Sequence, residues 1–183
     1  MSRITLITYF DEKQLDIISK FLENINLKMC KVPYGINDNK RYKIDNLPYH
    51  FTIFATDKIN QNKLLEIAKN TKMEKIKLKI NKVKIGNIKN GSFILYFGIE
   101  DNCFMKNLQR NFYEVIPEEK YNPYNFNFHM TLHIDKSFNI VNNLFKMIKL
   151  KFKPFSIEFN KLALYDYPGE IIETIEFQKN ISK

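Results

Sequence analysis

The sequence contains only three histidines, and two of them stand in the same short pattern. Residues 50–53 (HFTI) and 129–132 (HMTL) both have the order histidine, apolar, threonine, apolar, at an offset of 79 residues. Imidazole has an unperturbed pKa close to neutrality, so His50 and His129 can serve as a general acid and a general base. The hydroxyls of Thr52 and Thr131 can donate hydrogen bonds to an anion held between them.

Alternation along a strand decides where these side chains point. Residues i and i+2 of a strand lie on one face, so each histidine faces the same way as the threonine of its motif. The four intervening apolar residues then face the core: Phe51, Ile53, Met130 and Leu132. A twofold relation between the copies would place the two polar pairs across a cleft, where they suit the tetrahedral oxygens of a phosphodiester. This chemistry needs no metal or cofactor, and the sequence contains no convincing metal site.

A second pair of segments repeats at the same offset. Residues 77–85 (KLKINKVKI) resemble residues 156–164 (SIEFNKLAL), with Asn81-Lys82 matching Asn160-Lys161. In both segments apolar and polar residues alternate, and the alternation changes phase directly after Asn-Lys. Such alternation predicts a half-buried strand, and the phase slip predicts a bulge or a tight bend. The shared irregularity indicates an internal duplication, with units of about 1–91 and 92–183.

Each unit is predicted to contain a strand, a helix, a loop, the His-Thr strand, a second helix and the strand with the phase slip. The first strands are Ile4–Phe10 and Phe93–Ile99, the first helices begin at Asp11 and Asp101, and the second helices are Ile59–Asn70 and Ser137–Ile148. The fold class that follows is α+β, a bilobal duplicated unit. We expect one domain over residues 1–183, with two antiparallel sheets facing a central cleft and helices on the outer faces.

Composition limits the class of protein. The 183 residues are 44% hydrophobic and 27% charged, which excludes a disordered tail and a membrane protein. No apolar run approaches the roughly 20 residues that cross a bilayer, and the first residues lack a signal peptide's apolar stretch. Cys30 and Cys103 have no metal-ligand spacing and predict no disulfide framework. We expect a cytoplasmic monomer with no membrane partner.

The net charge of +9 is compatible with a nucleic-acid ligand, but it does not decide the matter. The chain is rich in Lys, Asn and Ile, a combination that an AT-rich genome favours whatever the function. The lysine-rich run over residues 72–89 alternates with apolar residues, which indicates the outer face of a sheet rather than an RNA track.

The two His-Thr motifs within a duplicated α+β unit resemble the 2H phosphoesterase superfamily, in its bacterial branch of 2′-5′ RNA ligase-like proteins and cyclic phosphodiesterases. The resemblance covers essentially the whole chain. It implies a metal-independent enzyme, without cofactors, that hydrolyses a 2′,3′-cyclic or 2′-5′ linked nucleotide or RNA phosphodiester, with 2′-5′ RNA ligation as a related activity. It further implies that His50 and His129 are catalytic and that Thr52 and Thr131 bind the phosphate. In the hydrolytic direction His129 would be the base and His50 the acid, although the pseudo-symmetry of the sequence favours neither assignment.

Further substrate contacts are less sharply defined. Tyr34 and Arg41 lie in the loop before the first motif, and Lys136 follows the second motif where relatives often have Arg. His133 shares strand parity with His129 and is expected at the rim of the cleft, with substrate contact as one reading. Two other functions stay open: an RNA- or nucleotide-binding module that holds phosphate without turnover, and a scaffold that uses the fold for protein contacts.

Overall fold

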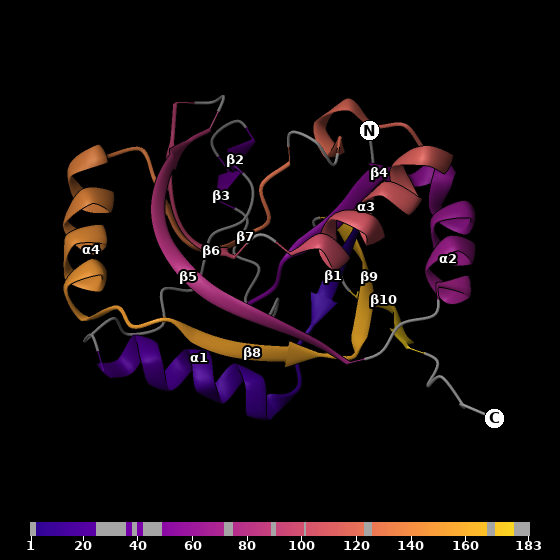
Figure 1. Cartoon of the computed structure of the whole chain (residues 1–183). Helices are drawn as coiled ribbons and strands as arrows, with labels where there is room; N and C mark the ends of the chain where they lie inside the picture. The colour runs from indigo at the N-terminus through magenta and orange to yellow at the C-terminus, as the bar shows by residue number, and fades with distance from the viewer. Residues whose placement is uncertain are drawn as a thin grey trace.

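The computed structural model describes residues 3–24, 36–37, 40–41, 49–71, 75–88, 91–100, 102–122, 126–167 and 171–177. Within these residues the chain forms two four-stranded antiparallel sheets, one two-stranded ribbon and four α-helices (Figure 1). The predicted α+β class with two antiparallel sheets is confirmed.

The first sheet has the strand order β10-β9-β1-β4, and each neighbouring pair is antiparallel. Its strands are β1 (Arg3–Tyr9), β4 (Thr52–Asp57), β9 (Lys161–Tyr167) and β10 (Ile171–Glu176). The strand that carries Thr52 therefore lies at an edge of this sheet. The small ribbon, β2 (Ile36–Asn37) and β3 (Lys40–Arg41), falls in the segment that the sequence predicts as an irregular loop.

The second sheet has the order β7-β6-β5-β8. Its strands are β5 (Ile76–Asn87), β6 (Phe93–Ile99), β7 (His129–Asp135) and β8 (Phe155–Phe159). The strand that carries the second motif, β7, is again an edge strand. Gly91, with φ of 77°, supplies the left-handed residue of the turn between β5 and β6, where its N–H donates to the carbonyl of Ile88.

The predicted phase slip is present in both copies. In β5 the pairing with β6 shifts between Ile80 and Lys82, so Asn81 is an extra residue in the strand. In the second copy the chain leaves β8 at Phe159 and begins β9 at Lys161, with Asn160 between the two strands. One copy bends within a strand, whereas the other passes from one sheet to the other at the equivalent residue.

The two sheets do not coincide with the two halves of the sequence. β9 and β10, from the second half, complete the sheet of β1 and β4, and β5, from the first half, lies inside the sheet of β6 and β7. The helices are exchanged as well. The helix after β1, α1 (Glu12–Asn24), lies against β8, where the N–H of Glu158 donates to Oε1 of Gln14 at 2.8 Å. The helix after β6, α3 (Cys103–Val115), lies against β4.

The helix starts follow local capping. Asp11 accepts a hydrogen bond from the N–H of Gln14 at 2.9 Å and begins α1 as predicted. For α3 the capping residue is Asn102 rather than Asp101, because its side chain accepts from the N–H of Met105 at 3.1 Å. The second helices are α2 (Gln61–Asn70), after a short 3₁₀ turn, and α4 (Phe138–Lys151), which covers β5, β6 and β7.

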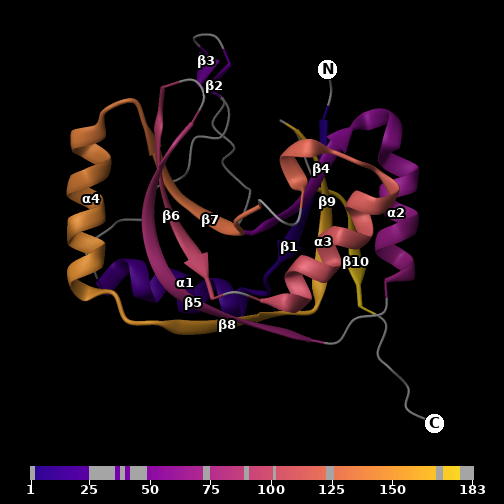
Figure 2. The same cartoon turned by 45° about the horizontal axis from the view of Figure 1, so that its top comes forward.

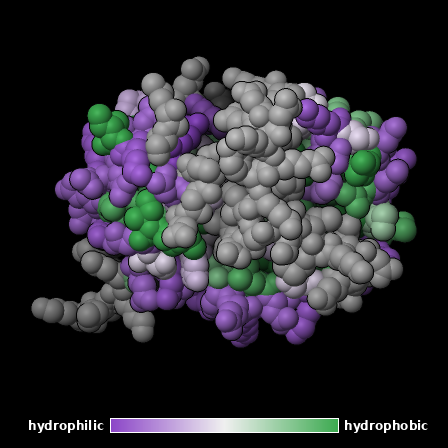
Figure 3. Space-filling model, turned by 180° about the vertical axis from the view of Figure 1, so that it is seen from behind, coloured by the Kyte–Doolittle hydropathy of each residue, from purple (hydrophilic) through white to green (hydrophobic). Residues whose placement is uncertain are grey.

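The core fills the space between each sheet and its helices, and the four apolar residues of the two motifs lie in it as predicted: Phe51, Ile53, Met130 and Leu132. Seen from behind, the described surface is largely hydrophilic, with separate hydrophobic groups rather than one broad apolar face (Figure 3). Among the described helices, none combines the length and the apolar character that a membrane span requires.

Candidate active site

The first motif lies where β4 begins. His50 is buried, with 6% of its surface exposed, and Thr52 is half-buried at the first position of the strand. In the ladder with β1, Leu6 pairs with Phe54 and Ile7 pairs with Thr52, so Ile53 has no partner of its own. Ile53 is therefore the extra residue of a β-bulge that directly follows Thr52.

The second motif has the same irregularity at the same place. In the ladder between β6 and β7, Leu95 pairs with His133 and Tyr96 pairs with Thr131, which leaves Leu132 as the extra residue. Leu132 is the repeat counterpart of Ile53. A bulge bends its strand and turns the side chains on either side of it, and bulges are frequent beside active sites. The two copies thus share a backbone irregularity that the motif letters alone do not reveal.

Two buried polar side chains fix the backbone of the first motif. The hydroxyl of Thr8 accepts a hydrogen bond from the N–H of Phe51 at 2.9 Å, and the N–H of Thr8 donates to the carbonyl of Phe51 at 2.9 Å. From α3, Nε2 of Gln109 donates to the carbonyl of Ile53 at 3.0 Å. The residues on both sides of Thr52 are therefore held in place by groups that are themselves buried.

The two motif strands approach each other at the centre of the molecule. β4 and β7 are the edge strands of their sheets. Both views of the ribbon show the beginnings of these strands near each other, between the two sheets, with the strands running apart toward opposite sides (Figures 1 and 2). The beginnings carry the motifs, since β4 starts at Thr52 and β7 starts at His129.

The ring of His129 has a fixed orientation. Its Nδ1 lies 3.0 Å from the carbonyl oxygen of Asn127. A carbonyl oxygen only accepts hydrogen bonds, so Nδ1 carries the proton and Nε2 of the neutral ring keeps its lone pair. The ring of Tyr96 approaches that of His129 edge-on with 5.3 Å between centroids, and the ring of Phe126 lies at 6.4 Å.

The surroundings of His129 favour its neutral form. Burial lowers the pKa of His129 below the ordinary 6.5, the hydrogen bond to Asn127 opposes this effect, and the positive charge of Lys120 adds to it. A neutral imidazole with a free Nε2 is the form that accepts a proton from water or from a hydroxyl group.

A chain of aromatic contacts connects His129 to the first sheet. Phe126, next to His129, packs on Tyr121 with ring centroids 5.2 Å apart, and Tyr121 packs on Phe54 of β4 at 5.3 Å. The guanidinium of Arg3 lies 5.8 Å from the centroid of the Tyr121 ring. The segment before the second motif is thus anchored on the sheet that carries the first motif.

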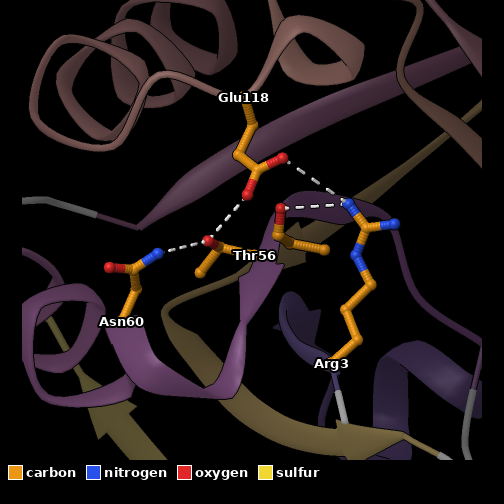
Figure 4. A network of polar contacts seen from close by, with 5 residues as sticks. Arg3, Thr56, Asn60 and Glu118 are labelled. Atoms are coloured by element: carbon orange, nitrogen blue, oxygen red, sulfur yellow. Dashed lines mark hydrogen bonds and ion pairs between the residues drawn. The ribbon is translucent and has the colours of Figure 1, made fainter. Parts of the chain in front are cut away.

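A polar network secures the same segment at Glu118 (Figure 4). The hydroxyl of Thr56 donates to one carboxylate oxygen of Glu118 at 2.8 Å, and the amide of Asn60 donates to the Thr56 hydroxyl at 2.9 Å. Arg3 lies 4.0 Å from the other carboxylate oxygen and donates to the backbone carbonyl of Ala55 at 3.4 Å. Thr56 is fully buried, whereas the side chains of Arg3 and Glu118 are partly exposed, so the network links a buried hydroxyl to an ion pair near the surface.

His133 lies on the opposite face of its sheet from the one expected. With Leu132 as an extra residue, the alternation changes phase, and His133 packs toward α4 in a small cavity lined with Leu95, Leu144 and Ile148. Its repeat counterpart is Phe54, a fully buried core residue. The expectation of a place at the cleft rim is therefore wrong, because it assumed unbroken alternation past Leu132.

The other predicted substrate contacts are only partly described. Lys136 is exposed, directly after β7. Arg41 belongs to β3, where only the backbone is described, and Tyr34 lies outside the described residues. Over the described parts of the chain, no three His, Cys, Asp or Glu side chains gather in a group that could hold a metal ion.

Sequence reasoning missed the residues that support the motifs, notably Thr8, Tyr96, Gln109 and Phe126. The repeat gives no signal for Tyr96, because the residue that pairs with the first threonine is Ile7 rather than an aromatic residue. The one available signal for Gln109 is its place on the helix face that carries Leu108 and Phe112, where a polar residue is unusual.

No protein-family model and no curated protein sequence matches the chain. Solved structures do. The chain is similar to LigT of E. coli in complex with 3′-AMP, at 12% identity and a TM-score of 0.55, over 97% of this chain and 95% of that one. It is similar to Usb1 of Kluyveromyces marxianus, at 11% identity and a TM-score of 0.53, over 96% and 97% of the two chains.

A structure described as a phosphoesterase is also similar, at 12% identity and a TM-score of 0.56, over 96% of this chain and 93% of that one. These neighbours are members of the 2H phosphoesterase superfamily. At such low identity the likeness concerns the fold, and it extends over nearly the full length of every chain compared. The chain therefore has the duplicated fold of the 2H phosphoesterases, and the resemblance seen in its two His-Thr motifs is confirmed for the fold.

Proposed function

We propose that the protein is a metal-independent phosphodiesterase that hydrolyses a 2′,3′-cyclic or 2′-5′ linked nucleotide or RNA phosphodiester by two-histidine general acid–base catalysis. The observation that carries the proposal is the matched geometry of the motifs. Both motifs lie at the beginning of an edge strand, and both threonines precede a bulge at the same repeat position. The two strands begin near each other between the sheets (Figures 1 and 2).

The comparisons support the class of substrate. LigT has been solved with 3′-AMP, ATP, NADP⁺ and phosphate, and Usb1 with uridine monophosphate. Both neighbours thus bind nucleotides, and we extend this to the present chain. We further propose that it acts in the cytoplasm, as a monomer, and that its acid and base are side chains rather than a metal-bound water.

The state of His129 supports the assignment of roles. Its Nδ1 carries a proton held by the Asn127 carbonyl, so Nε2 is the atom that accepts a proton. In our mechanism this Nε2 takes a proton from water as the water oxygen bonds to phosphorus. The bond from phosphorus to the ribose 3′ oxygen breaks, and protonated His50 gives its proton to that oxygen. The product is a 2′-phosphate, and one water is consumed.

The threonines complete the proposed site. As the phosphorus becomes five-coordinate, negative charge grows on its two non-bridging oxygens. The hydroxyls of Thr52 and Thr131 would donate hydrogen bonds to these oxygens, and donors held in place by a folded strand need no reorganisation during the reaction. The bulges matter here because they set the direction of each threonine relative to its strand.

The test is turnover on a panel of nucleoside 2′,3′-cyclic phosphates, 2′-5′ linked dinucleotides and RNA ending in a cyclic phosphate. His50→Ala and His129→Ala should each lower kcat about 10²- to 10⁴-fold, as expected for loss of one proton-transfer group. Thr52→Val and Thr131→Val should lower it about 10²-fold or more. His133→Leu is the matched control, since it removes a histidine from the same strand on the opposite face.

Two results would contradict the proposal. Equal turnover by the wild type and by both alanine variants would exclude the motifs from the chemistry. Binding of the panel without any product would instead favour a module that holds phosphate. EDTA should leave turnover unchanged. Loss of turnover in the presence of EDTA would indicate a metal-dependent enzyme.

A further inference from the structure

Beside His129 the second sheet forms the floor of a cavity of about 300 Å³. The volume lies at the lower end of the range for small-molecule sites. Three lysines line it, Lys82 and Lys84 from β5 and Lys106 from α3. We refer to this cavity as the lysine pocket.

The lysine pocket lies on the same face of the sheet as the second motif. His129 pairs with Gly98 on β6, and Gly98 pairs with Lys82 on β5, so these three residues form one row across three strands. The next row consists of Thr131, Tyr96 and Lys84. Neighbouring strands are about 4.8 Å apart, which places the Cα of Lys82 about 10 Å from that of His129.

The floor of the pocket is open because its central residue has no side chain. A Cβ at Gly98 would lie 3.3 Å from the Cβ of Lys82, closer than most real contacts. Any larger residue there would fill the space between His129 and the lysines. Gly98 thus keeps a continuous surface from the motif to the amino groups.

The charge in the pocket is positive. Among the described residues that line the pocket, the acidic one is Glu100. Its carboxylate lies 3.4 Å from the amino group of Lys79, a residue outside the pocket. Within the described part of the chain, neither Lys82 nor Lys84 has an acidic partner at ion-pair distance. Both are exposed. Their charges are therefore available to an anion. The alternation predicted the outer face of a sheet for this run, but the pairing places Lys82 and Lys84 on the face that carries Tyr96 and His129.

Aromatic rings stand between the lysines and the motif. Tyr96 and Phe126 both line the pocket and both contact the ring of His129. A base or sugar attached to the scissile phosphate can pack on such rings, as bases stack on aromatic side chains in proteins that bind single strands. Positive charge lies next to them, since Lys84 pairs with Tyr96 on the adjacent strand. The rings of Tyr96 and Phe126 could contact the nucleoside, and the amino groups of the neighbouring lysines could bind a second phosphate on it.

We propose that the lysine pocket binds the phosphate next to the scissile phosphodiester, so that the preferred substrates carry at least two phosphates, as in a short oligonucleotide or a 5′-phosphorylated nucleoside cyclic phosphate. This rests on the proposed function, because it takes the scissile group to lie at His129 and Thr131. It assigns part of the basic charge of the chain to substrate selection.

The test compares kcat/KM for the best nucleoside 2′,3′-cyclic phosphate of the panel with kcat/KM for its 5′-phosphorylated form. In the wild type we expect the 5′-phosphorylated substrate to be favoured about tenfold or more, and in Lys82→Ala/Lys84→Ala we expect the ratio to fall to about one. The control variant Lys77→Ala/Lys146→Ala removes the same charge from exposed sites outside the pocket, and it should keep the wild-type ratio.

A binding arm separates this inference from the proposed function. Calorimetry with adenosine 2′-phosphate and adenosine 2′,5′-bisphosphate requires no turnover, and the bisphosphate should bind about tenfold more tightly unless Lys82 and Lys84 are removed. If the bisphosphate is preferred in a lysine-dependent way but no substrate is turned over, the proposed phosphodiesterase activity is wrong and the proposed phosphate site in the lysine pocket is supported. If substrates are turned over without a preference for the 5′ phosphate, or if that preference persists in Lys82→Ala/Lys84→Ala, the proposed phosphate site is wrong and the proposed activity is supported.

Discussion

Leu78 of β5 and Ile157 of β8 are the two copies of one repeat position, and they pair directly with each other. The offset between them is the same 79 residues that separates His50 from His129. On either side the pairing is symmetric, since Ile76 pairs with Phe159 and Ile80 with Phe155. A local twofold axis therefore passes between Leu78 and Ile157 in the pairing of β5 with β8.

Because both side chains at this axis are fully buried, we expect Leu78→Ala and Ile157→Ala each to lower the free energy of unfolding by about 2–5 kcal/mol. The double variant should lose less than the sum, since the two residues are neighbours. Urea unfolding monitored by circular dichroism measures these values. The exposed neighbour Lys77→Ala should change stability by less than about 0.5 kcal/mol, and a loss as large as that of Leu78→Ala would argue against a buried axis.

The pH dependence of turnover should report His129. Burial lowers its pKa below 6.5, and the base must be neutral to act, so kcat/KM should rise with pH along an acid limb centred below 6.5. Lys120 contributes to the lowering by repelling the protonated ring. Lys120→Ala should therefore move the acid limb toward higher pH. An acid limb centred above 6.5, or one that Lys120→Ala leaves in place, would be incompatible with His129 as the base.

Gln109 should act on the site through the backbone of the first motif. In Gln109→Met the carbonyl of Ile53 loses its buried donor, and we expect a cost of about 1–3 kcal/mol in stability. Because Ile53 is the bulge residue after Thr52, kcat should fall while the affinity for a bound 2′-nucleotide changes less. Asn111→Ala, an exposed position on the same helix, is the control. If Gln109→Met is less stable but kcat is unchanged, Gln109 stabilises the fold without positioning Thr52 for catalysis.

His133 should affect stability and not turnover. Both ring nitrogens are buried and have no hydrogen-bond partner among the described residues, and Oδ2 of Asp135 is 3.8 Å from Nε2. Burial lowers the pKa of His133, with Asp135 opposing this, so the unfolded chain binds a proton at a higher pH than the folded chain does. Stability is then lost as pH falls from about 6.5 through the folded pKa.

His133→Leu should remove this contribution. We expect the variant to be more stable than the wild type by about 1 kcal/mol, with the larger gain at about pH 5.5 than at about pH 8. Urea unfolding at the two pH values, together with kcat on the preferred substrate, measures both effects. A fall in kcat of tenfold or more would return His133 to the active site.

Local patterns were sufficient to predict much of the fold. Strict alternation placed Phe51 and Met130 in the core, and the polar residue Asp11 marked the start of α1. Both signals depend on residues adjacent in sequence, where period and capping act directly. The phase slip at Asn81 was also visible, because it changes which letters are apolar.

Other features depend on contacts between distant residues. The bulge at Leu132 cannot be read from the sequence, because the order Leu132, His133, Ile134 still alternates between apolar and polar residues as in a regular strand. The face of His133 was therefore predicted wrongly. The exchange of β5 and β9 between the sheets is equally invisible, because pairing partners lie in another part of the chain. The lysine pocket could not be predicted from the sequence either, because Lys82 lies near His129 only through the pairing of both residues with Gly98.

The pairing of β1 with β9 has a consequence for the order in which the molecule forms. β1 precedes both of its partners in the chain, and it can pair early with β4, but its other partner is β9 (Lys161–Tyr167). Synthesis proceeds from the N-terminus at about 5–20 residues per second, so β1 waits several seconds with one edge unpaired. Contacts so far apart in sequence are also slow to close. The first sheet is therefore completed only after β9 has been synthesised, and until then the unpaired edge of β1 is the surface that a chaperone or an aggregating neighbour would meet.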